Sequence, residues 1–393
     1  MHSMNPYSCI IAFFLLSILY MLMRMHLFSG PTPTTVHVTD AAAVRAVLAP
    51  QTGLAAQLLA RAIPNSRFER GFGILSTFTS ASEHVHADFT RRALSRISPH
   101  GASYPWHDIA AAARHSVEAR LPVDRRTIDF DTFTQIVTLK VVLVQLLDAP
   151  DVMREGDLAS VAHHMGEIWR ASKSGDPTQH LLAEVNGHLR RWLPMEDNPI
   201  ELVIPAYETS WRAVAHTVAL ANRDLAARAA FDAFMALPST TSFRGLVGDV
   251  EFSVEMFVGE IFRLYPPTRH ITRVVPVGDC PFPIAVPGQP RDITVVADIE
   301  AVQRDPAVWG ATAEGFDPTR FCTLTALQKR SLLSFGHGRL SCIAKDWAPL
   351  AVAILAGAVL ERVGPESEYR LLEGPRLGRR DGWHGWEVRE AEV

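Results

Sequence analysis

The sequence has few cysteines and no excess of positive charge, and both shortages limit what the protein can be. Four cysteines occur in 393 residues, and they lie far apart, at Cys9, Cys280, Cys322 and Cys342. Scattered thiols build neither a disulfide framework nor the CxxC pairs of a zinc site, so we expect free thiols in a reducing compartment. The net charge of −4 gives no indication of nucleic-acid binding, which needs a basic excess.

Internal repeats, low-complexity tracts and a regular alternation of strands with helices are also missing from the sequence. Two histidine clusters invite a metal-site interpretation, namely His84 with His86, and His163 with His164 beside Glu167. Because no HExxH pattern accompanies them, we interpret both as solvated helix faces. With 48% hydrophobic and 20% charged residues, the chain can build a sizeable core.

A long uncharged run is present at the N-terminus. No residue from Met4 to Met23 carries a formal charge, which is just enough length for a membrane-spanning helix of about 20 residues. A cleaved signal peptide is the alternative, but the basic start, the shorter apolar run and the A-x-A-like site are missing. We therefore expect a single-pass anchor over residues 1–28 with Arg24 on the cytosolic side, and a proline-rich hinge over 29–35.

After the hinge, hydrophobic periodicity predicts a mainly α chain with small β-sheets over residues 36–393, without a clear break between domains. Thr39 and Asp40 are expected to cap the first helix. The predicted helices are 41–48, the second half of 71–97, 130–147, 158–192 and a long pattern over 201–230. The predicted strands are 36–38, 271–277, 291–298, 368–372 and 386–390.

The stretch SFGHGRLSCIA, from Ser334 to Ala344, places a cysteine directly after a glycine-rich turn. Its GHGRLS part nearly matches a phosphate-binding GxGxxG, but the third glycine is a serine and no βαβ unit surrounds it. A buried structural thiol is the second interpretation. The third is a thiolate at a helix start, on a loop that glycines let approach a planar partner, with Phe335 covering the sulfur. A haem iron that is held by one cysteine thiolate requires these three features.

Four segments in the same order resemble the cytochrome P450 family. The family's F-x-x-G-x-x-x-C-x-(G/A) is matched by Phe335, Gly338, Cys342 and Ala344. The other three are its E-x-x-R helix with LYPP, its P-x-R segment after AVQRDPAVWG, and its oxygen-activation motif, at 260–267, 301–321 and 205–210. The chain is most similar to filamentous-fungal, microsomal-type members, with a shortened N-terminal half.

The resemblance implies a cytochrome P450 fold, a single large haem-binding domain over 36–393, and haem b with Cys342 as the axial iron ligand. A basic residue is usual where Leu340 stands, so the other haem contacts are expected from Phe335, Gly338, His337, Arg339, Arg273 and Arg92. Glu208 and Thr209 would relay protons to bound O2. Glu260 and Arg263 share a helix face and, with Arg320, would form a structural charge network.

The implied activity is that of a haem-thiolate monooxygenase acting on a small apolar molecule, such as a secondary-metabolite intermediate. Electrons would come from NADPH-cytochrome P450 reductase, which would dock near Lys329, Arg330, Arg339 and Lys345. The enzyme would be anchored in the endoplasmic reticulum membrane with its catalytic domain in the cytosol. Two alternatives remain open: a haem enzyme that isomerises, dehydrates or couples its substrate, and a truncated, haem-free, membrane-bound relative.

Overall fold

The structure is a computed structural model, and it describes residues 34–98, 105–124, 126–282 and 291–391. The predicted anchor over 1–28 and most of the predicted hinge lie outside these residues. Within them, no helix combines the length and the apolar character that crossing a membrane requires.

Helices make up most of the described chain, as the periodicity predicts. They are α2 Ala41–Leu48, α3 Leu54–Phe72, α4 Glu83–Ile97, α5 Trp106–Arg120, α6 Phe130–Val141, α7 Glu155–Ser174, α8 Gln179–Trp192, α9 Ile200–Tyr207, α10 Ser210–Ala221, α11 Leu225–Ala236, α12 Thr240–Arg244, α13 Val254–Leu264, α14 Ile299–Arg304, α15 Pro306–Trp309, α16 Ala326–Ser331 and α17 Ala348–Leu360. A π-helical turn, η1 (Val142–Leu146), extends α6. As predicted, the Asp40 side chain accepts a hydrogen bond from Ala43 N at the start of α2.

Helix α17 is the centre of the helical body. Its sequence is apolar on every face, and an all-apolar helix is stable only when other elements surround it. It packs against α5, α10, α11 and α13. A Cβ on Gly357 would lie 2.5 Å from Met235 Cγ, so a glycine is needed where α11 crosses α17.

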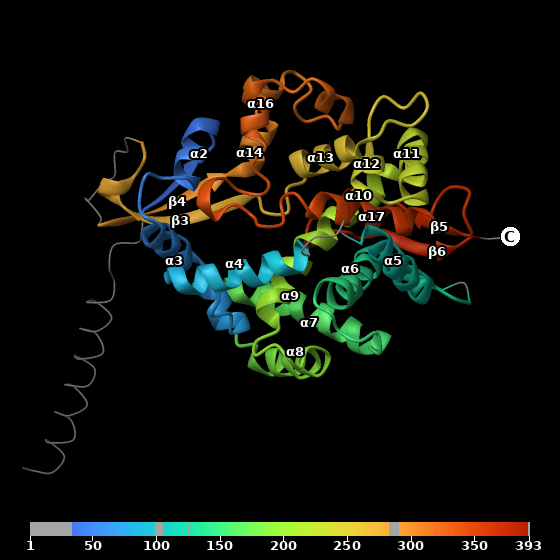
Figure 1. Cartoon of the computed structure of the whole chain (residues 1–393), viewed down its shortest axis with the longest axis horizontal. Coiled ribbons are helices and arrows are strands. Elements are labelled where there is room, and N and C mark those ends of the chain that lie inside the picture. Colours follow the sequence, from blue (N-terminus) through green and yellow to red (C-terminus); the bar gives the residue numbers. More distant parts are fainter. Residues whose placement is uncertain (1–33, 99–104, 125, 283–290, 392–393) are drawn as a thin grey trace, which may run out of the picture.

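Two small sheets flank this body. In the first, β4 (Asp292–Asp298) lies between β1 (Thr35–Val38), to which it is parallel, and β3 (His270–Pro276), to which it is antiparallel. In the second, β6 (Glu387–Glu390) pairs antiparallel with both β2 (Thr127–Asp129) and β5 (Tyr369–Leu372). The sheets lie at opposite ends of the molecule, with the helices between them (Figure 1).

The structure corrects the long helical predictions and adds one strand. The predicted helix 158–192 is two helices, because Gly175 adopts the left-handed conformation (φ 84°) that ends α7. The 201–230 pattern is three helices, interrupted at Glu208–Thr209 after Pro205 and again before Asp224, which caps α11. Strand β2 was not predicted, because three residues are too few for an alternating pattern to be recognised.

Candidate functional site

The loop that carries Cys342 is held by its own backbone. Gly336 N donates to Leu333 O at 2.8 Å, and Cys342 N donates to Phe335 O at 2.7 Å, which closes the loop around a short 3-10 turn. Gly336 and Gly338 have φ values of 71° and 74°, a conformation that other residues rarely adopt. A Cβ on Gly338 would lie 2.6 Å from Ala49 Cβ, so this glycine also lets the loop pack against the end of α2.

The position of Cys342 differs in one respect from the prediction. Residues 343–347 form turns and α17 begins only at Ala348, so the cysteine precedes the helix instead of starting it. The side chain is accessible, yet the surrounding protein is close enough to raise the pKa of the thiol by desolvation. A hydrogen bond from the Ala344 backbone lowers that pKa in part. A metal cation at the accessible sulfur would replace the proton and favour the thiolate, so the donor fits a haem iron.

Phe335 and Ser334 attach this loop to α13. The rings of Phe335 and Phe262 have centroids 4.8 Å apart, and Ser334 Oγ donates to Phe262 O at 2.6 Å. The Phe335 ring therefore lies against the helix that carries the E-x-x-R motif. The two motifs, far apart in the sequence, form one packed unit beside the cysteine.

The structure brings Glu260, Arg263 and Arg320 together. The Glu260 and Arg263 side chains are fully buried and form two hydrogen bonds of 2.7 Å, and Arg320 Nε donates to Glu260 Oε1 at 3.1 Å. Arg263 also donates to the carbonyls of Gln303 and Ala313, at 2.7 Å each. Since all these groups are paired, the network ties α13 to the segment 303–320 without leaving a buried charge unsatisfied.

Gln303, which the sequence analysis missed, connects this network to the cysteine loop. Its buried side chain donates to Arg263 O at 2.9 Å, and its oxygen accepts from Leu333 N at 2.7 Å and from Ser334 Oγ at 3.0 Å. The signal available in the sequence was a lone glutamine in an otherwise amphipathic segment. Such a residue is usually solvated, so only the fold reveals its role.

We expect Gln303→Ala to lower the free energy of unfolding by about 2–4 kcal/mol, because buried groups of α13 and of the cysteine loop lose their hydrogen-bond partner. Urea denaturation followed by circular dichroism measures the change. Gln179→Ala, an exposed glutamine on α8, is the matched control and should change stability by less than about 0.5 kcal/mol. Equal effects of the two substitutions would contradict the bridging role.

Two buried arginines lack a carboxylate partner among the residues that the structure describes. Arg273 on β3 donates only to the neighbouring Thr272 O, and Arg61 on α3 donates to the backbone and hydroxyl oxygens of Thr77. Burial lowers the pKa of each guanidinium to about 10, and the positive charge of Arg61 contributes to the shift at Arg273. Adjacent buried cations need an anion. The two propionates of a haem supply that charge, so these residues fit the group.

Three further residues predicted to contact haem differ in burial and in their charged neighbours, and their roles stay predictions. His337 is partly buried, and desolvation and the nearby Arg45 lower its pKa. Arg339 is exposed on the 3-10 turn of the cysteine loop. Arg92 forms ion pairs with Glu196 and, at 4.0 Å, with Asp88, so carboxylates of the chain itself already balance its charge.

Glu208 and Thr209 lie where the helical pattern breaks between α9 and α10. Thr209 Oγ1 is 3.5 Å from Pro205 O, the carbonyl one turn earlier. Glu208 is buried, and its carboxylate accepts hydrogen bonds from Arg380 and, at 3.3 Å, from Trp211 Nε1. The sequence placed this carboxylate beside Thr209, but did not reveal that Arg380 of the tail binds it.

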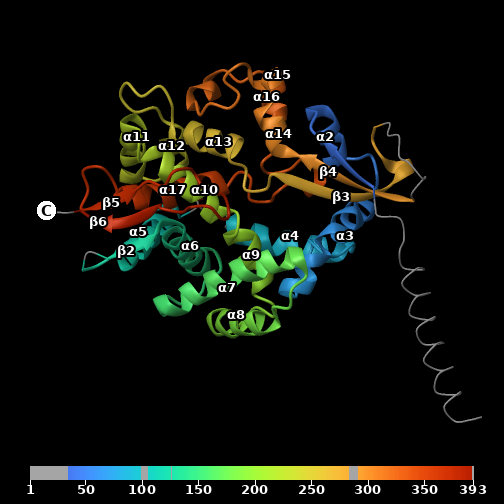
Figure 2. The ribbon, with the colours of Figure 1, turned by 180° about the vertical axis from the view of Figure 1, so that it is seen from behind.

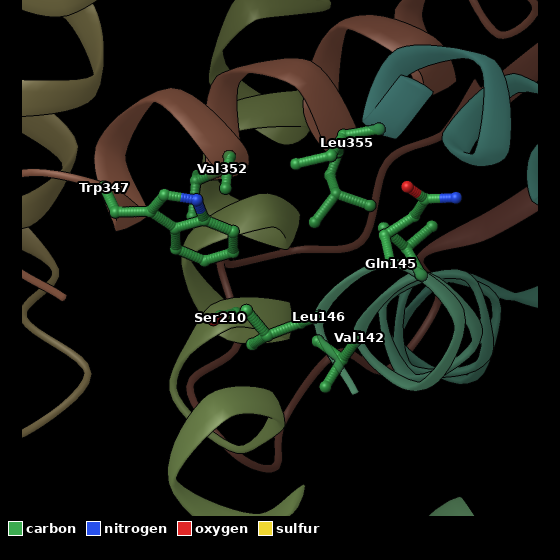
Figure 3. A pocket seen from close by; sticks show the side chains of 10 residues that line it. Val142, Gln145, Leu146, Ser210, Trp347, Val352 and Leu355 are labelled. Carbon is green, nitrogen blue, oxygen red and sulfur yellow. The ribbon is translucent and has the colours of Figure 1, made fainter. Parts of the chain in front are cut away.

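A cavity of about 20 Å³ lies between the starts of α10 and α17, room for about one water molecule. Ser210, which follows Thr209, and Trp347, which lies between Cys342 and α17, both line it (Figure 3). Side chains of α5, α6, α17 and the π-helical turn, all apolar except Gln145, complete the wall. The oxygen-motif segment and the end of the cysteine loop therefore approach each other in the fold.

Comparisons with known proteins agree on one family. The family model described as cytochrome P450 matches residues 253–365. A cytochrome P450 monooxygenase of Aspergillus fumigatus is 34% identical over 104 residues, which cover 24% of this chain and 19% of that protein. Cytochrome P450 714A2 of Arabidopsis thaliana is 28% identical over 117 residues, which cover 28% of this chain and 21% of that protein. The match thus spans about one fifth of the length of these relatives.

Solved structures extend the similarity to nearly the whole chain at the level of fold. The haem domain of a mutant cytochrome P450DA superposes with a TM-score of 0.65 at 16% identity, covering 91% of this chain and 87% of that one. CYP175A1 of Thermus thermophilus gives a TM-score of 0.61 at 17% identity, covering 91% and 89%. The family model matches the segment that holds α13, Gln303 and the cysteine loop, so the chain has a cytochrome P450 segment at residues 253–365 and, over nearly its whole length, a fold similar to that of solved cytochromes P450.

Proposed function

We propose that the protein is a haem-thiolate monooxygenase that oxidises a small, largely apolar molecule with O2 and externally supplied electrons. The observation that carries the proposal is the accessible Cys342 sulfur, held on a closed backbone loop and receiving one hydrogen bond from Ala344. The cofactor that the family implies is a thiolate-ligated haem. When bound, it supplies the O2 chemistry, because a thiolate ligand donates electron density that favours O–O cleavage.

Each group that the haem needs has a candidate among the described residues. Cys342 would ligate the iron, with the Ala344 N–H tuning the electron density on sulfur. Arg61 and Arg273 would bind the propionates, which would satisfy two guanidinium groups whose hydrogen-bond partners in the described part of the chain are hydroxyl and carbonyl oxygens. Phe335 would shield the sulfur on the side of α13.

Proton supply is assigned to Thr209 and Glu208. Thr209 Oγ1 is only weakly bonded to Pro205 O, at 3.5 Å, so the hydroxyl can turn to another acceptor. The Glu208 carboxylate is bonded to Arg380, so it would be available to the Thr209 hydroxyl only when Arg380 releases it. Proton delivery would then depend on what else binds Arg380.

The side chains of Lys329, Arg330, Arg339 and Lys345 are exposed and lie within or close to the cysteine loop in the sequence, and they form our candidate docking surface for an electron donor, NADPH-cytochrome P450 reductase. Opposite charges on a partner would steer it to this surface. We also propose that residues 36–393 act as one haem domain. The uncharged run within residues 1–28 would anchor it to the endoplasmic reticulum membrane, facing the cytosol.

At low ionic strength, we expect Lys345→Glu to slow reduction by the reductase about three- to tenfold. A charge at the edge of a protein–protein interface acts mainly on the rate at which the two proteins associate. Stopped-flow absorbance of the first electron transfer measures this rate. Arg190→Glu on α8 is a control of equal charge change, and Figure 1 shows α8 on the opposite side of the molecule from α16. A rate that is insensitive to both Lys345→Glu and added salt would place the docking surface elsewhere.

One observation favours a second candidate function. Because the Glu208 carboxylate is held in a buried ion pair, a haem reaction that needs no proton delivery, such as an isomerisation or a dehydration, also suits the site. Product analysis with and without NADPH separates the two. A product that forms at the same rate without NADPH would favour the second candidate.

The direct test of the proposed function is a carbon-monoxide difference spectrum of the dithionite-reduced, membrane-expressed protein. We expect a strongly red-shifted Soret band, the signature of haem iron that is held by a thiolate. Folded protein without any haem signal would overturn the proposal and leave a haem-free relative.

A further inference from the structure

Two arginines from distant parts of the chain share one tryptophan ring. The Cζ atom of Arg380, in the segment between β5 and β6, lies 4.3 Å from the centre of the Trp169 indole on α7. The Cζ atom of Arg67, on α3, lies 5.0 Å from the same centre and 4.0 Å from the centre of the Phe68 ring. Helices α3 and α7 pack directly against each other, and Figure 2 shows the green α7 running towards the blue α3.

The positive charges of this cluster exceed the negative charges placed to balance them. Arg380 is bonded to Glu208, whereas Arg67 has Ser172 Oγ at 2.9 Å and no ion pair with a carboxylate among the described residues. Desolvation lowers the pKa of the Lys173 amine, and the nearby charges of Arg380 and Arg67 lower it further, while Asp381 raises it. Asp381 is itself paired with Arg170 at 3.2 Å. Arg67 and Lys173 therefore have charge to offer an anion.

The surroundings of the cluster are apolar and aromatic. The rings of Phe68 and Phe72 lie 5.1 Å and 6.2 Å from the Trp169 ring, and both phenylalanines belong to α3. Stacking on aromatic faces keeps a guanidinium in place and leaves its N–H groups free at the ring edge. An anionic group attached to an apolar body fits such a site better than a free inorganic ion does.

We propose that Arg67, Lys173 and Arg380 around Trp169 bind the carboxylate of an amphipathic organic acid, the substrate of the proposed monooxygenase. The assignment of the acid as substrate rests on that proposed function. Carboxylate is the anion chosen because its two oxygens match the planar fork of an arginine. The sequence led us to expect a plain apolar substrate, whereas the cluster selects for one charged end.

The cluster also connects substrate charge to proton supply. Arg380 bonds Glu208, and Glu208 directly precedes Thr209. A substrate carboxylate that binds Arg380 competes with Glu208 for the same guanidinium. Binding the correct substrate would thus release the Glu208 carboxylate from Arg380, with Trp211 Nε1 at 3.3 Å and Arg212 at 3.8 Å as its remaining partners, and make it available to the hydroxyl of Thr209 when a substrate is present.

The test compares octanoate with octan-1-ol, which share a chain and differ in the charged end. Isothermal titration calorimetry on the purified full chain gives the two dissociation constants, and their ratio is the acid preference. Arg67→Gln is the informative variant because Arg67 has no ion pair to lose among the described residues, whereas loss of Arg380 would leave the buried Glu208 with only the more distant Arg212, at 3.8 Å, as an ionic partner. Arg67→Lys keeps the charge, and Arg91→Gln, an exposed arginine of α4, is the control.

We expect the wild type to bind octanoate at least about tenfold more tightly than octan-1-ol. Hydrogen bonds between the carboxylate and the charged side chains are strong enough to give a ratio of this size between the two dissociation constants. Arg67→Gln should remove most of that preference, Arg67→Lys should retain part of it, and Arg91→Gln should retain all of it. Equal binding of acid and alcohol by the wild type would overturn the proposal. So would an acid preference that survives in a folded Arg67→Gln protein.

The same samples separate this proposal from the proposed function. The carbon-monoxide difference spectrum reports haem, whereas calorimetry reports the acid site without requiring turnover. An Arg67-dependent acid preference in protein without haem would support the anion site and reject the monooxygenase. A normal haem signal without acid preference would reject the anion site alone.

Discussion

Cys342→Ser should abolish the red-shifted Soret band of the reduced carbon-monoxide complex, with a loss that is essentially complete. A serine hydroxyl stays protonated near neutral pH and cannot replace a thiolate as the electron-donating ligand. The folded structure should survive, because the loop is closed by backbone bonds from Cys342 N to Phe335 O and from Gly336 N to Leu333 O, which the substitution leaves in place. The spectrum and far-ultraviolet circular dichroism of the same preparation measure the two parts of this prediction.

Cys322→Ser is the matched control, because Cys322 is an exposed thiol whose sulfur contacts Glu251 O and Met256 Sδ, away from the glycine loop. It should leave the band unchanged. If the Cys342→Ser protein kept the wild-type band, the iron ligand would have to be another residue, and the interpretation of the whole loop would be wrong.

Arg263→Met should have the largest effect on stability, a loss of about 3–5 kcal/mol in the free energy of unfolding. The substitution leaves the fully buried Glu260 carboxylate with Arg320 Nε at 3.1 Å as its remaining ionic partner, and it strips Gln303 O and Ala313 O of their donor. That loss is a large fraction of the stability of an ordinary domain, so we also expect a low yield of folded protein. Urea denaturation gives the free energy.

A double-mutant cycle separates the ion pair from general disruption of α13. Glu260→Gln combined with Arg263→Met should cost clearly less than the sum of the two single changes, because the double variant removes both charges of the buried pair and leaves only Arg320 without its carboxylate. The exposed pair Arg244 and Glu255, 3.1 Å apart, is the control, and Arg244→Met should change stability by less than about 1 kcal/mol. Strict additivity at 260 and 263 would contradict the network.

Local sequence patterns predicted the structure correctly where it depends on residues that are close together in the chain. The Asp40 cap and α2, the alternating strands β3 and β4, and the mainly helical class all follow from short-range preference and periodicity. Helix ends were harder, because the stops at Gly175 and before Asp224 interrupt patterns that are otherwise continuous in hydrophobicity. Helix propensity is summed over many residues, whereas a single glycine in the left-handed conformation is enough to end a helix.

The sequence by itself determined the candidate iron ligand, the glycines beside it and the pairing of Glu260 with Arg263, since each is a matter of spacing along one loop or one helix face. Only the tertiary structure decided which distant groups meet. It joins Gln303 to the cysteine loop, places Arg61 near Arg273, and brings Arg380 from the tail to Glu208 and Trp169. Such partners are separated by many residues, and burial and charge balance select them only once the chain has folded.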